Sequence, residues 1–136
     1  MPIIGERLNK IHAERGKLER KMEIKTHIDL VDVSIQKIGV AAESKEGLAF
    51  SFVFKVNYGK AGGKIDVEGD VFYLDTPAKM KEIEDSWKKN KKLDAKLRMA
   101  IMNRVLELSY LQAIAMADQI RLPPPMQMPR FVEKKK

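Results

Sequence analysis

The sequence contains no cysteine, which excludes disulfide bonds and zinc sites built from thiolates. It has no run of about 18 uncharged apolar residues, the minimum for a membrane-spanning helix. Its first residues, MPIIGERLNK, carry charge too early for a secretion signal. From these absences we expect no membrane insertion and a reducing compartment, most simply the cytoplasm.

Charge is plentiful but unevenly distributed, with a net charge of +7. Residues 1–78 hold 12 basic and 12 acidic side chains, whereas residues 79–104 hold 9 basic and 4 acidic ones, and residues 121–136 hold 5 basic and 1 acidic. The positive field of the second half attracts RNA, acidic membranes or acidic proteins. The alternative is an ordinary lysine-rich surface that only meets water.

The first half of the chain predicts strands, with a first strand from Glu6 to Arg15. From Met22 apolar and polar residues alternate, and after Leu30 the apolar phase shifts by one residue to Val31. In a flat strand such a shift would turn the polar, solvent-facing side toward the core. It therefore predicts a β-bulge near Leu30–Val31. The polar residues from Gly39 to Gly47 are expected to form a loop.

The strongest pattern predicts an antiparallel hairpin. A perfect alternation of period two places one set of side chains on a single face, namely Leu48, Phe50, Phe52, Phe54, Val56 and Tyr58. The glycine-rich turn GKAGG follows, and the return strand has Ile65, Val67, Val71 and Tyr73 on its inner face. Three apolar side chains point the other way, Val53, Phe72 and Leu74. A sheet that is apolar on both faces is expected to be covered on both.

Two helices are predicted after the hairpin. Thr76 is suited to cap the first helix and Pro77 to begin it, and this helix runs to about Lys89. The second helix extends from about Asp94 to Ile120, long enough at about 1.5 Å per residue to lie along the whole sheet. The predicted fold is therefore α+β, a four-stranded antiparallel sheet with two C-terminal helices packed on one face.

The second half of the long helix is apolar nearly all round. From Val105 to Ile120 the only charged residues are Glu107 and Asp118, and a helix of this kind is buried on more than one side. One sheet covers one side, so the other side requires a second subunit or a bound partner. The prolines after Leu122 end the helix. Met126 and Met128 beyond them are expected either to anchor the tail or to line a binding groove.

No catalytic motif is present, and we predict no enzyme, no cofactor and no metal. His12 and His27 are expected to be ordinary strand residues instead of metal ligands with Asp29. The segment GKAGGK lacks the following helix and the Ser or Thr of a phosphate loop, so a hairpin turn is the better interpretation. The carboxylates of Asp66, Glu68 and Asp70 lie on one face of a strand. They form either an acidic binding stripe or simply a face that meets solvent.

A lysine cluster between the two helices is the best candidate for nucleic-acid binding, because neutralised phosphates are its natural ligands. Trp87 lies beside it and either stacks on a base or packs in the core with Met80 and Ile83. The core is favoured. The RNA-binding candidates are Lys88, Lys89, Lys91, Lys92, Lys96, Arg98, Lys134, Lys135 and Lys136.

The order of these elements resembles the SecB family of export chaperones, over roughly residues 4–131. RLNKIHAER resembles the opening strand of the family, LAFSFVFKVNYGKAGGKIDVEGDVFYL the central hairpin, and IRLPPPMQMPRF the apolar ending. The resemblance implies one SecB-like domain over residues 1–131, followed by a basic tip at 132–136. It further implies a holdase that binds unfolded or nascent polypeptides, uses no cofactor and assembles as a dimer or a tetramer.

Two features depart from the family pattern. The chain is basic where bacterial members are acidic, and the connection RGKLERK is short and basic where a longer apolar loop is expected. These departures favour an alternative, a ribosome-associated or RNA-binding protein that uses the same fold. The candidates for client binding or a subunit interface are Val53, Phe72, Leu74, Met99, Met102, Met116, Met126, Met128 and Phe131.

Overall fold

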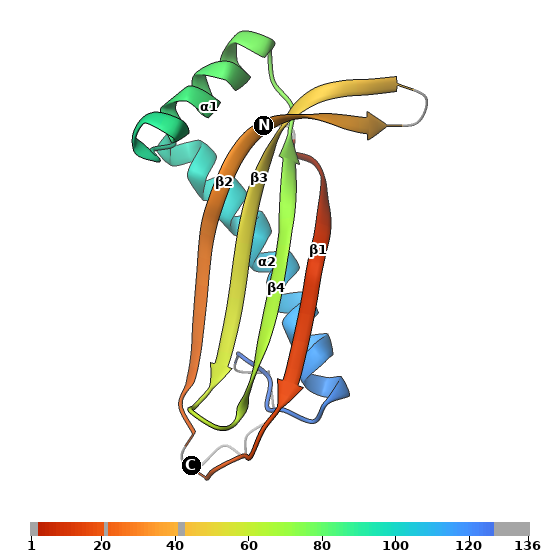
Figure 1. Cartoon of the computed structure of the whole chain (residues 1–136), viewed down its shortest axis with the longest axis vertical. Helices are drawn as coiled ribbons and strands as arrows, with labels where there is room; N and C mark the ends of the chain where they lie inside the picture. Colours follow the sequence, from red (N-terminus) through yellow and green to blue (C-terminus); the bar gives the residue numbers. More distant parts are fainter. Residues whose placement is uncertain (1–2, 21, 41–42, 127–136) are drawn as a thin grey trace, which may run out of the picture.

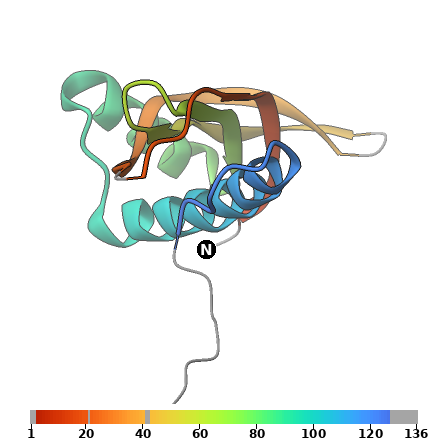
Figure 2. The ribbon, with the colours of Figure 1, turned by 90° about the horizontal axis from the view of Figure 1, so that it is seen from below.

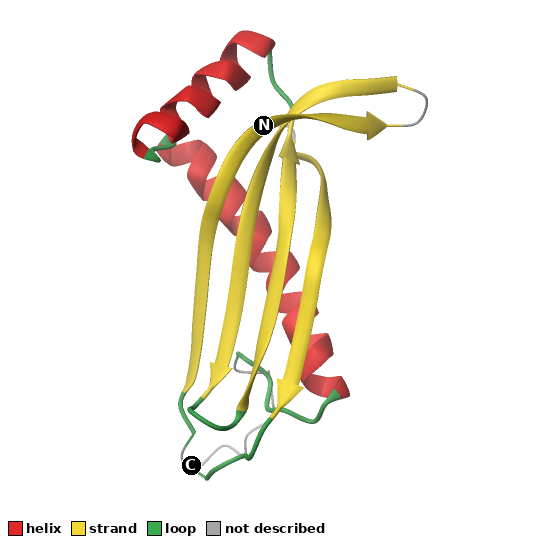
Figure 3. Ribbon diagram, viewed as in Figure 1, coloured by secondary structure: helices red, strands yellow, loops and turns green. Residues whose placement is uncertain are grey.

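Four strands and two helices make up the fold, seen in a computed structural model that describes residues 3–20, 22–40 and 43–126. The strands are β1 (Ile3–Arg15), β2 (Ile24–Val40), β3 (Glu43–Tyr58) and β4 (Gly63–Tyr73). The helices are α1 (Pro77–Asn90) and α2 (Ala95–Gln119). The sheet is antiparallel in the order β1-β4-β3-β2 (Figures 1 and 3). The predicted α+β class, four-stranded sheet and pair of C-terminal helices are confirmed.

Helix α2 covers one face of the sheet and crosses its strands obliquely (Figures 1 and 2). Its buried residues recur every fourth position, at Leu97, Ile101, Val105, Ser109, Ala113 and Ala117. Four residues turn an α-helix about 40° beyond one full turn, so this ridge winds around the helix. The winding ridge stays on the sheet only if the helix axis is inclined to the strands. Helix α1 packs against the same core near β2 and β3.

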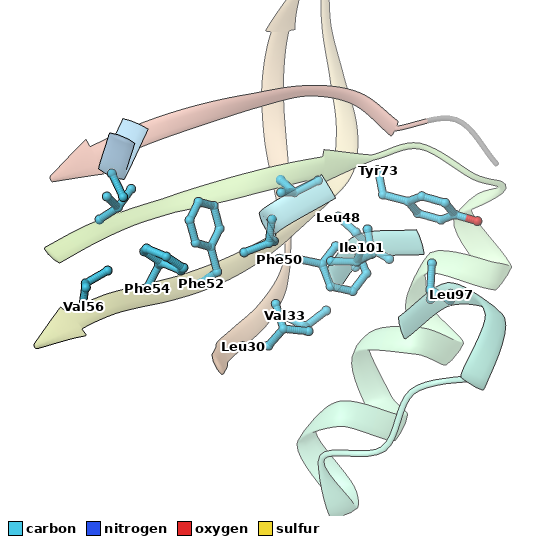
Figure 4. Close-up of a cluster of buried hydrophobic side chains, with 14 of the residues drawn as sticks. Leu30, Val33, Leu48, Phe50, Phe52, Phe54, Val56, Tyr73, Leu97 and Ile101 are labelled. Carbon is cyan, nitrogen blue, oxygen red and sulfur yellow. The ribbon is translucent and has the colours of Figure 1, made fainter. Parts of the chain in front are cut away.

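The core lies between α2 and the inner face of β3 and β4. The side chains predicted to alternate inward on β3 are all buried, from Leu48 to Tyr58 (Figure 4). Their neighbours on β4 are Ile65, Val67, Val71 and Tyr73, which are buried as well. The predicted hairpin and its turn are confirmed, and Gly59 and Gly63 take the positive φ angles of 68° and 114° that the turn requires.

The predicted bulge in the second strand is also confirmed. Leu30 pairs with Phe52 and Val33 with Phe50, and the register shifts between Leu30 and Asp32. The extra residue lets both Leu30 and Val33 face the core, where both are buried. Val31 is left 49% exposed on the outer side of the bulge.

The loop expected from Gly39 to Gly47 is wrong. β2 continues to Val40 and β3 begins at Glu43, and their pairing runs from Gln36↔Gly47 to Val40↔Glu43. The hydrogen bonds between paired strands are made by backbone groups. Polar residues can therefore continue a strand pair without an alternating apolar pattern in the sequence. β4 ends opposite Leu48. These pairs therefore form a two-stranded arm, which bends away from the sheet (Figure 1).

α2 ends at Gln119, before the three prolines, in a defined C-terminal cap. Arg121 has a φ of 59°, and the Leu122 N–H donates to the carbonyl of Ala117 at 2.9 Å, the pattern of a Schellman motif. The Tyr58 hydroxyl then donates to the carbonyl of Pro123 at 2.6 Å. Leu122 and Pro125 are buried. The chain after the helix thus turns back onto the sheet.

Candidate binding surfaces on the long helix and at the helix junction

The side of α2 that faces away from the sheet carries an apolar surface, which we call the outer stripe. Its members are Met99, Leu106, Leu111 and Ile114, and the exposed polar residues Asn103 and Glu107 lie among them. Met99 is 64% exposed and Leu111 is 62% exposed. Leu106 and Ile114 are half-buried but do not belong to the apolar side chains packed on the core. Met102 and Tyr110 do pack on the core, Tyr110 with its ring centre 5.1 Å from that of Phe54. The stripe therefore presents apolar side chains to solvent at intervals along the helix.

A shallow hollow of about 320 Å³ continues the stripe at the C-terminal end of α2. It is lined by Ile114, Ala115, Ala117, Asp118, Leu122 and Pro124. The chain leaves this hollow at Met126, which is 46% exposed. Exposed Met126 does not anchor the tail within the described part of the chain; Leu122 and Pro125 are the buried residues there.

The structure places the described interface candidates in different environments. Met99 belongs to the outer stripe, whereas Met102 and Met116 are half-buried and pack on the core. Val53 and Phe72 lie on the opposite face of the sheet, both half-buried. Met128, Phe131, Lys134, Lys135 and Lys136 lie outside the described residues. The sequence prediction missed Leu106, Leu111 and Ile114, although their helical spacing relative to Met99 was a usable signal.

The face of the sheet that carries Phe72 is polar and internally paired. Asp70 is only 3% exposed, and it accepts hydrogen bonds from Arg7, Asn9 and Ser51 at 2.8, 2.8 and 2.6 Å. Burial alone would raise the pKa of Asp70, but these hydrogen bonds and the charge of Arg7 lower it below its ordinary value. Arg7 also stacks over Phe72, 5.3 Å from the ring centre.

The suggested acidic stripe on this face is therefore neither an open binding site nor simply solvated. Asp66 and Asp70 are buried, since residues of the edge strand β1 pair alongside them, and Glu68 is half-buried. Lys64 lies 3.7 Å from Asp66 and adds a second compensating charge. Opposite charges on neighbouring strands stabilise the pairing of β1, which has few buried apolar residues of its own.

Six cations gather where α1 passes into α2, a surface we call the basic corner. They are Lys88, Lys89, Lys91, Lys92, Lys96 and Arg98, and all six are exposed. Trp87 is 7% exposed and packs in the core with Met80 and Ile83, as favoured from the sequence. The basic corner thus displays charge without an accessible aromatic ring.

Hydrogen bonds hold the backbone of the basic corner in one conformation. Lys91 has a φ of 55° and its N–H donates to the carbonyl of Trp87 at 2.8 Å. The Ser86 hydroxyl donates to the carbonyl of Lys92 at 3.0 Å. Asp94 caps α2 by accepting from the Leu97 N–H at 3.4 Å. A small cleft of about 140 Å³ lies between the helices beside Tyr73.

Tyr73 closes the sheet side of that cleft. Burial and a hydrogen bond donated to Asp75 at 2.8 Å raise the pKa of Tyr73 to about 12. The phenol therefore stays protonated at neutral pH and acts as a hydrogen-bond donor. Its hydrogen bond ties the end of β4 to Asp75, just before α1 begins.

The histidines are not brought together by the fold. His12 lies 3.5 Å from Glu14 on β1, while His27 is exposed on β2 at the other edge of the sheet. In residues 3–20, 22–40 and 43–126, no group of three or more histidine, aspartate or glutamate side chains is arranged to hold a metal ion.

Comparison of the chain with protein-family models, with curated proteins and with solved structures gives no match. No helix among the described residues combines the length and the apolar character needed to cross a bilayer. The outer stripe and the basic corner are the two surfaces of the described residues that bear on function.

Proposed function

We propose that this protein is a SecB-like holdase, which binds unfolded or nascent polypeptides and keeps them from aggregating. The outer stripe of α2 carries the proposal. It needs no catalysis, cofactor or metal. A cytoplasmic location and assembly into a dimer or tetramer belong to the same proposal.

The exposure of the outer stripe is the observation that supports client binding. Solvent-facing helix positions are normally polar, whereas Met99 and Leu111 are exposed for more than half of their surface. Exposed apolar side chains grouped on one side of a helix suit the binding of another polypeptide. Methionine side chains are flexible and polarizable, so Met99 adapts to clients of different shape.

The dimensions of the stripe suit an extended peptide. From Met99 to Ile114 the helix rises by roughly 22 Å at 1.5 Å per residue. An extended chain covers that length with about seven residues, since each advances about 3.3 Å. The stripe residues themselves carry no polar group, so the stripe recognises apolar character and not a particular sequence.

Self-association follows from the same surface. A second copy that packs on part of the stripe would remove apolar side chains from water, at about 25 cal/mol per Å² of apolar area. Apolar stretches of an unfolded client would compete for this area. We therefore expect a homo-oligomer. When a client is added, either its molar mass should change or its stripe residues should become more accessible to solvent.

The test is suppression of the aggregation of reduced insulin, followed by light scattering. The chain has no cysteine, so the reductant that releases the insulin B chain leaves this protein unchanged. The unaltered protein should suppress scattering in proportion to its concentration. Because apolar burial carries the binding, suppression should change little between about 50 and about 300 mM salt. Absence of suppression at several-fold molar excess would reject the holdase.

A matched pair of variants locates the client surface. Met99→Ser with Leu111→Ser removes two exposed apolar side chains from the stripe, and Ile4→Ser with Val31→Ser removes two from strands. The stripe variant should lose most of its suppression, while the strand variant should keep it. Molar mass is measured in parallel. A stripe variant that becomes a monomer yet suppresses fully would make the stripe a subunit interface and refute its client role.

A further inference from the structure

We infer that the basic corner binds the phosphate backbone of RNA and does so without recognising bases. Between Lys88 and Arg98 the chain has six basic side chains and one acidic side chain, Asp94. Lys88 forms an ion pair with Glu84, at 3.5 Å. The other five cations are exposed and form no ion pair with the residues that the structure describes.

The cations are held in place by their backbone instead of by acidic partners. The αL conformation of Lys91 and the hydrogen bonds of Ser86 and Asp94 fix the path of the chain between the helices. The backbone N–H of Lys92 also donates to the Asn90 side chain at 3.2 Å. The lysine side chains therefore extend from a backbone of defined path, and binding an anion does not require this loop to be ordered first.

The spread of charge over the corner is the argument for RNA phosphates. Five lysines and one arginine offer separate point charges instead of a set of bidentate forks that would fix one carboxylate or one phosphate. The repeating phosphates of RNA match such spread charges without recognition of sequence. A lipid surface is the nearest alternative, because membrane surface binding adds apolar side chains that enter the lipid. Trp87 and Leu97 are buried, which leaves Met99 as the exposed apolar neighbour of the corner.

The buried position of Trp87 also predicts the kind of RNA binding. No aromatic ring of the corner is free to stack on a base, so discrimination between sequences should be absent. The outer stripe begins at Met99, one residue beyond Arg98. RNA held at the corner would therefore lie beside the apolar stripe. The inference does not depend on the holdase proposal, because it rests on different residues and a different assay.

The experiment measures fluorescence anisotropy of a labelled 20-nucleotide poly(U) RNA and of a mixed-sequence RNA of equal length, over a range of salt. Each phosphate neutralised on single strands contributes about −0.7 to the slope of log K against log salt. With four or five contacts, the slope should be roughly −3. The two RNAs should bind within about twofold of each other, since stacking and base contacts are absent.

Two triple variants of equal charge separate a local site from general positive charge. Lys89→Gln, Lys91→Gln and Lys92→Gln alter the corner, whereas Lys17→Gln, Lys25→Gln and Lys60→Gln alter exposed residues at the far end of the sheet. The corner variant should bind about tenfold more weakly or worse, with a slope shallower by about 2. The far-end variant should change affinity by less than about twofold.

Three outcomes would overturn the inference. The first is a salt slope near zero, or no binding at all in low salt, for the unaltered protein. The second is equal weakening of both variants, which would assign binding to net charge. The third is competition with the RNA by poly-glutamate or by vesicles with phosphatidylserine at equal charge concentration, which would assign the corner to an acidic protein or a lipid surface. Thermal unfolding of both variants confirms that each remains folded.

Discussion

Asp70 links residue chemistry to the stability of the sheet. It is nearly inaccessible and accepts three hydrogen bonds, one of them from the half-exposed Arg7. These contacts lower its pKa in the folded protein. A carboxyl whose folded pKa lies below its unfolded value stabilises the fold above the unfolded pKa of about 3.9, and this contribution is lost as pH falls through the lower folded value.

We therefore predict that Asp70→Asn lowers the free energy of unfolding by about 1–2 kcal/mol at neutral pH, because Arg7 and Asn9 lose their anionic acceptor. The difference from the unaltered protein should shrink below about pH 4 as Asp70 itself becomes protonated. Urea unfolding at several pH values measures both effects. Asp29→Asn, an exposed change on the same face, is the control and should be nearly neutral. A pH-independent difference would contradict the role given to the charge.

The burial of Asp70 marks a limit of prediction at the residue scale. Trp87 was placed in the core from its spacing to Met80 and Ile83, since helical periodicity acts over a few residues. Asp70 is buried by Arg7 and Asn9, which lie 63 and 61 residues away along the chain. Spacing within one strand carries no information on the register of a distant partner strand. The sequence therefore predicted the face of Asp70 but not its environment.

At the scale of elements, the end of α2 offers a test of how the helix is terminated. Arg121 adopts the left-handed conformation at the C′ position, where glycine is the usual residue. The left-handed conformation costs an L-residue about 1–2 kcal/mol, and glycine removes this cost. Part of the gain is lost, because glycine also increases the conformational entropy of the unfolded chain. We predict that Arg121→Gly raises the free energy of unfolding by about 0.5–1 kcal/mol. Urea or thermal unfolding measures the gain.

The control for this change is Arg121→Ala, which removes the same side chain but keeps the strained Cβ. The ion pair of Arg121 with Asp118, at 3.6 Å, joins two well-exposed side chains and contributes little. Alanine should therefore give no gain. Equal stability of the glycine and alanine variants would show that the backbone at residue 121 is not strained.

Element boundaries were predictable wherever a side-chain signal accompanied the backbone change. Thr76 and Pro77 predicted the start of α1, and the phase shift at Leu30 predicted the bulge. The arm beyond Ile35 had no such signal, since its ladder depends on backbone pairing of polar residues. Glu84 adds a contact that no pattern showed, as its carboxylate accepts the Ile35 N–H at 2.7 Å and closes that part of the β2 edge.

At the scale of the whole molecule, the two candidate surfaces follow from one helix. The inner side of α2 builds the core with β3 and β4, while its outer side and its first turn carry the apolar stripe and part of the basic corner. The sequence predicted that α2 needs a second partner and that lysines surround its start. It placed Val53 and Phe72 on the outer face of the sheet, but it did not predict that Arg7 stacks on Phe72, because the pairing of the distant strands β1 and β4 is decided by the tertiary fold.

The arm is the part of the molecule least coupled to this core. Beyond Leu48 its two strands have no third neighbour among the described residues, and Lys37, Lys45 and Glu46 are exposed. A two-stranded ribbon alone is only marginally stable in water. The arm should thus contribute little to folding, although Ile38 is half-buried beside Gly47.

We predict that replacing Lys37 through Glu46 by Asn-Gly, which joins Gln36 to Gly47 in a tight turn, changes the free energy of unfolding by less than about 1 kcal/mol. Phe50→Ala in the body of β3 is the reference for a true core change and should cost about 3–5 kcal/mol. Chemical unfolding compares the two directly. A shortened chain as unstable as Phe50→Ala would place the arm within the folding unit. A shortened chain that stays stable would show that folding does not need the arm. The unpaired backbone edges of the arm in the full chain would then be available to a partner strand by β-augmentation.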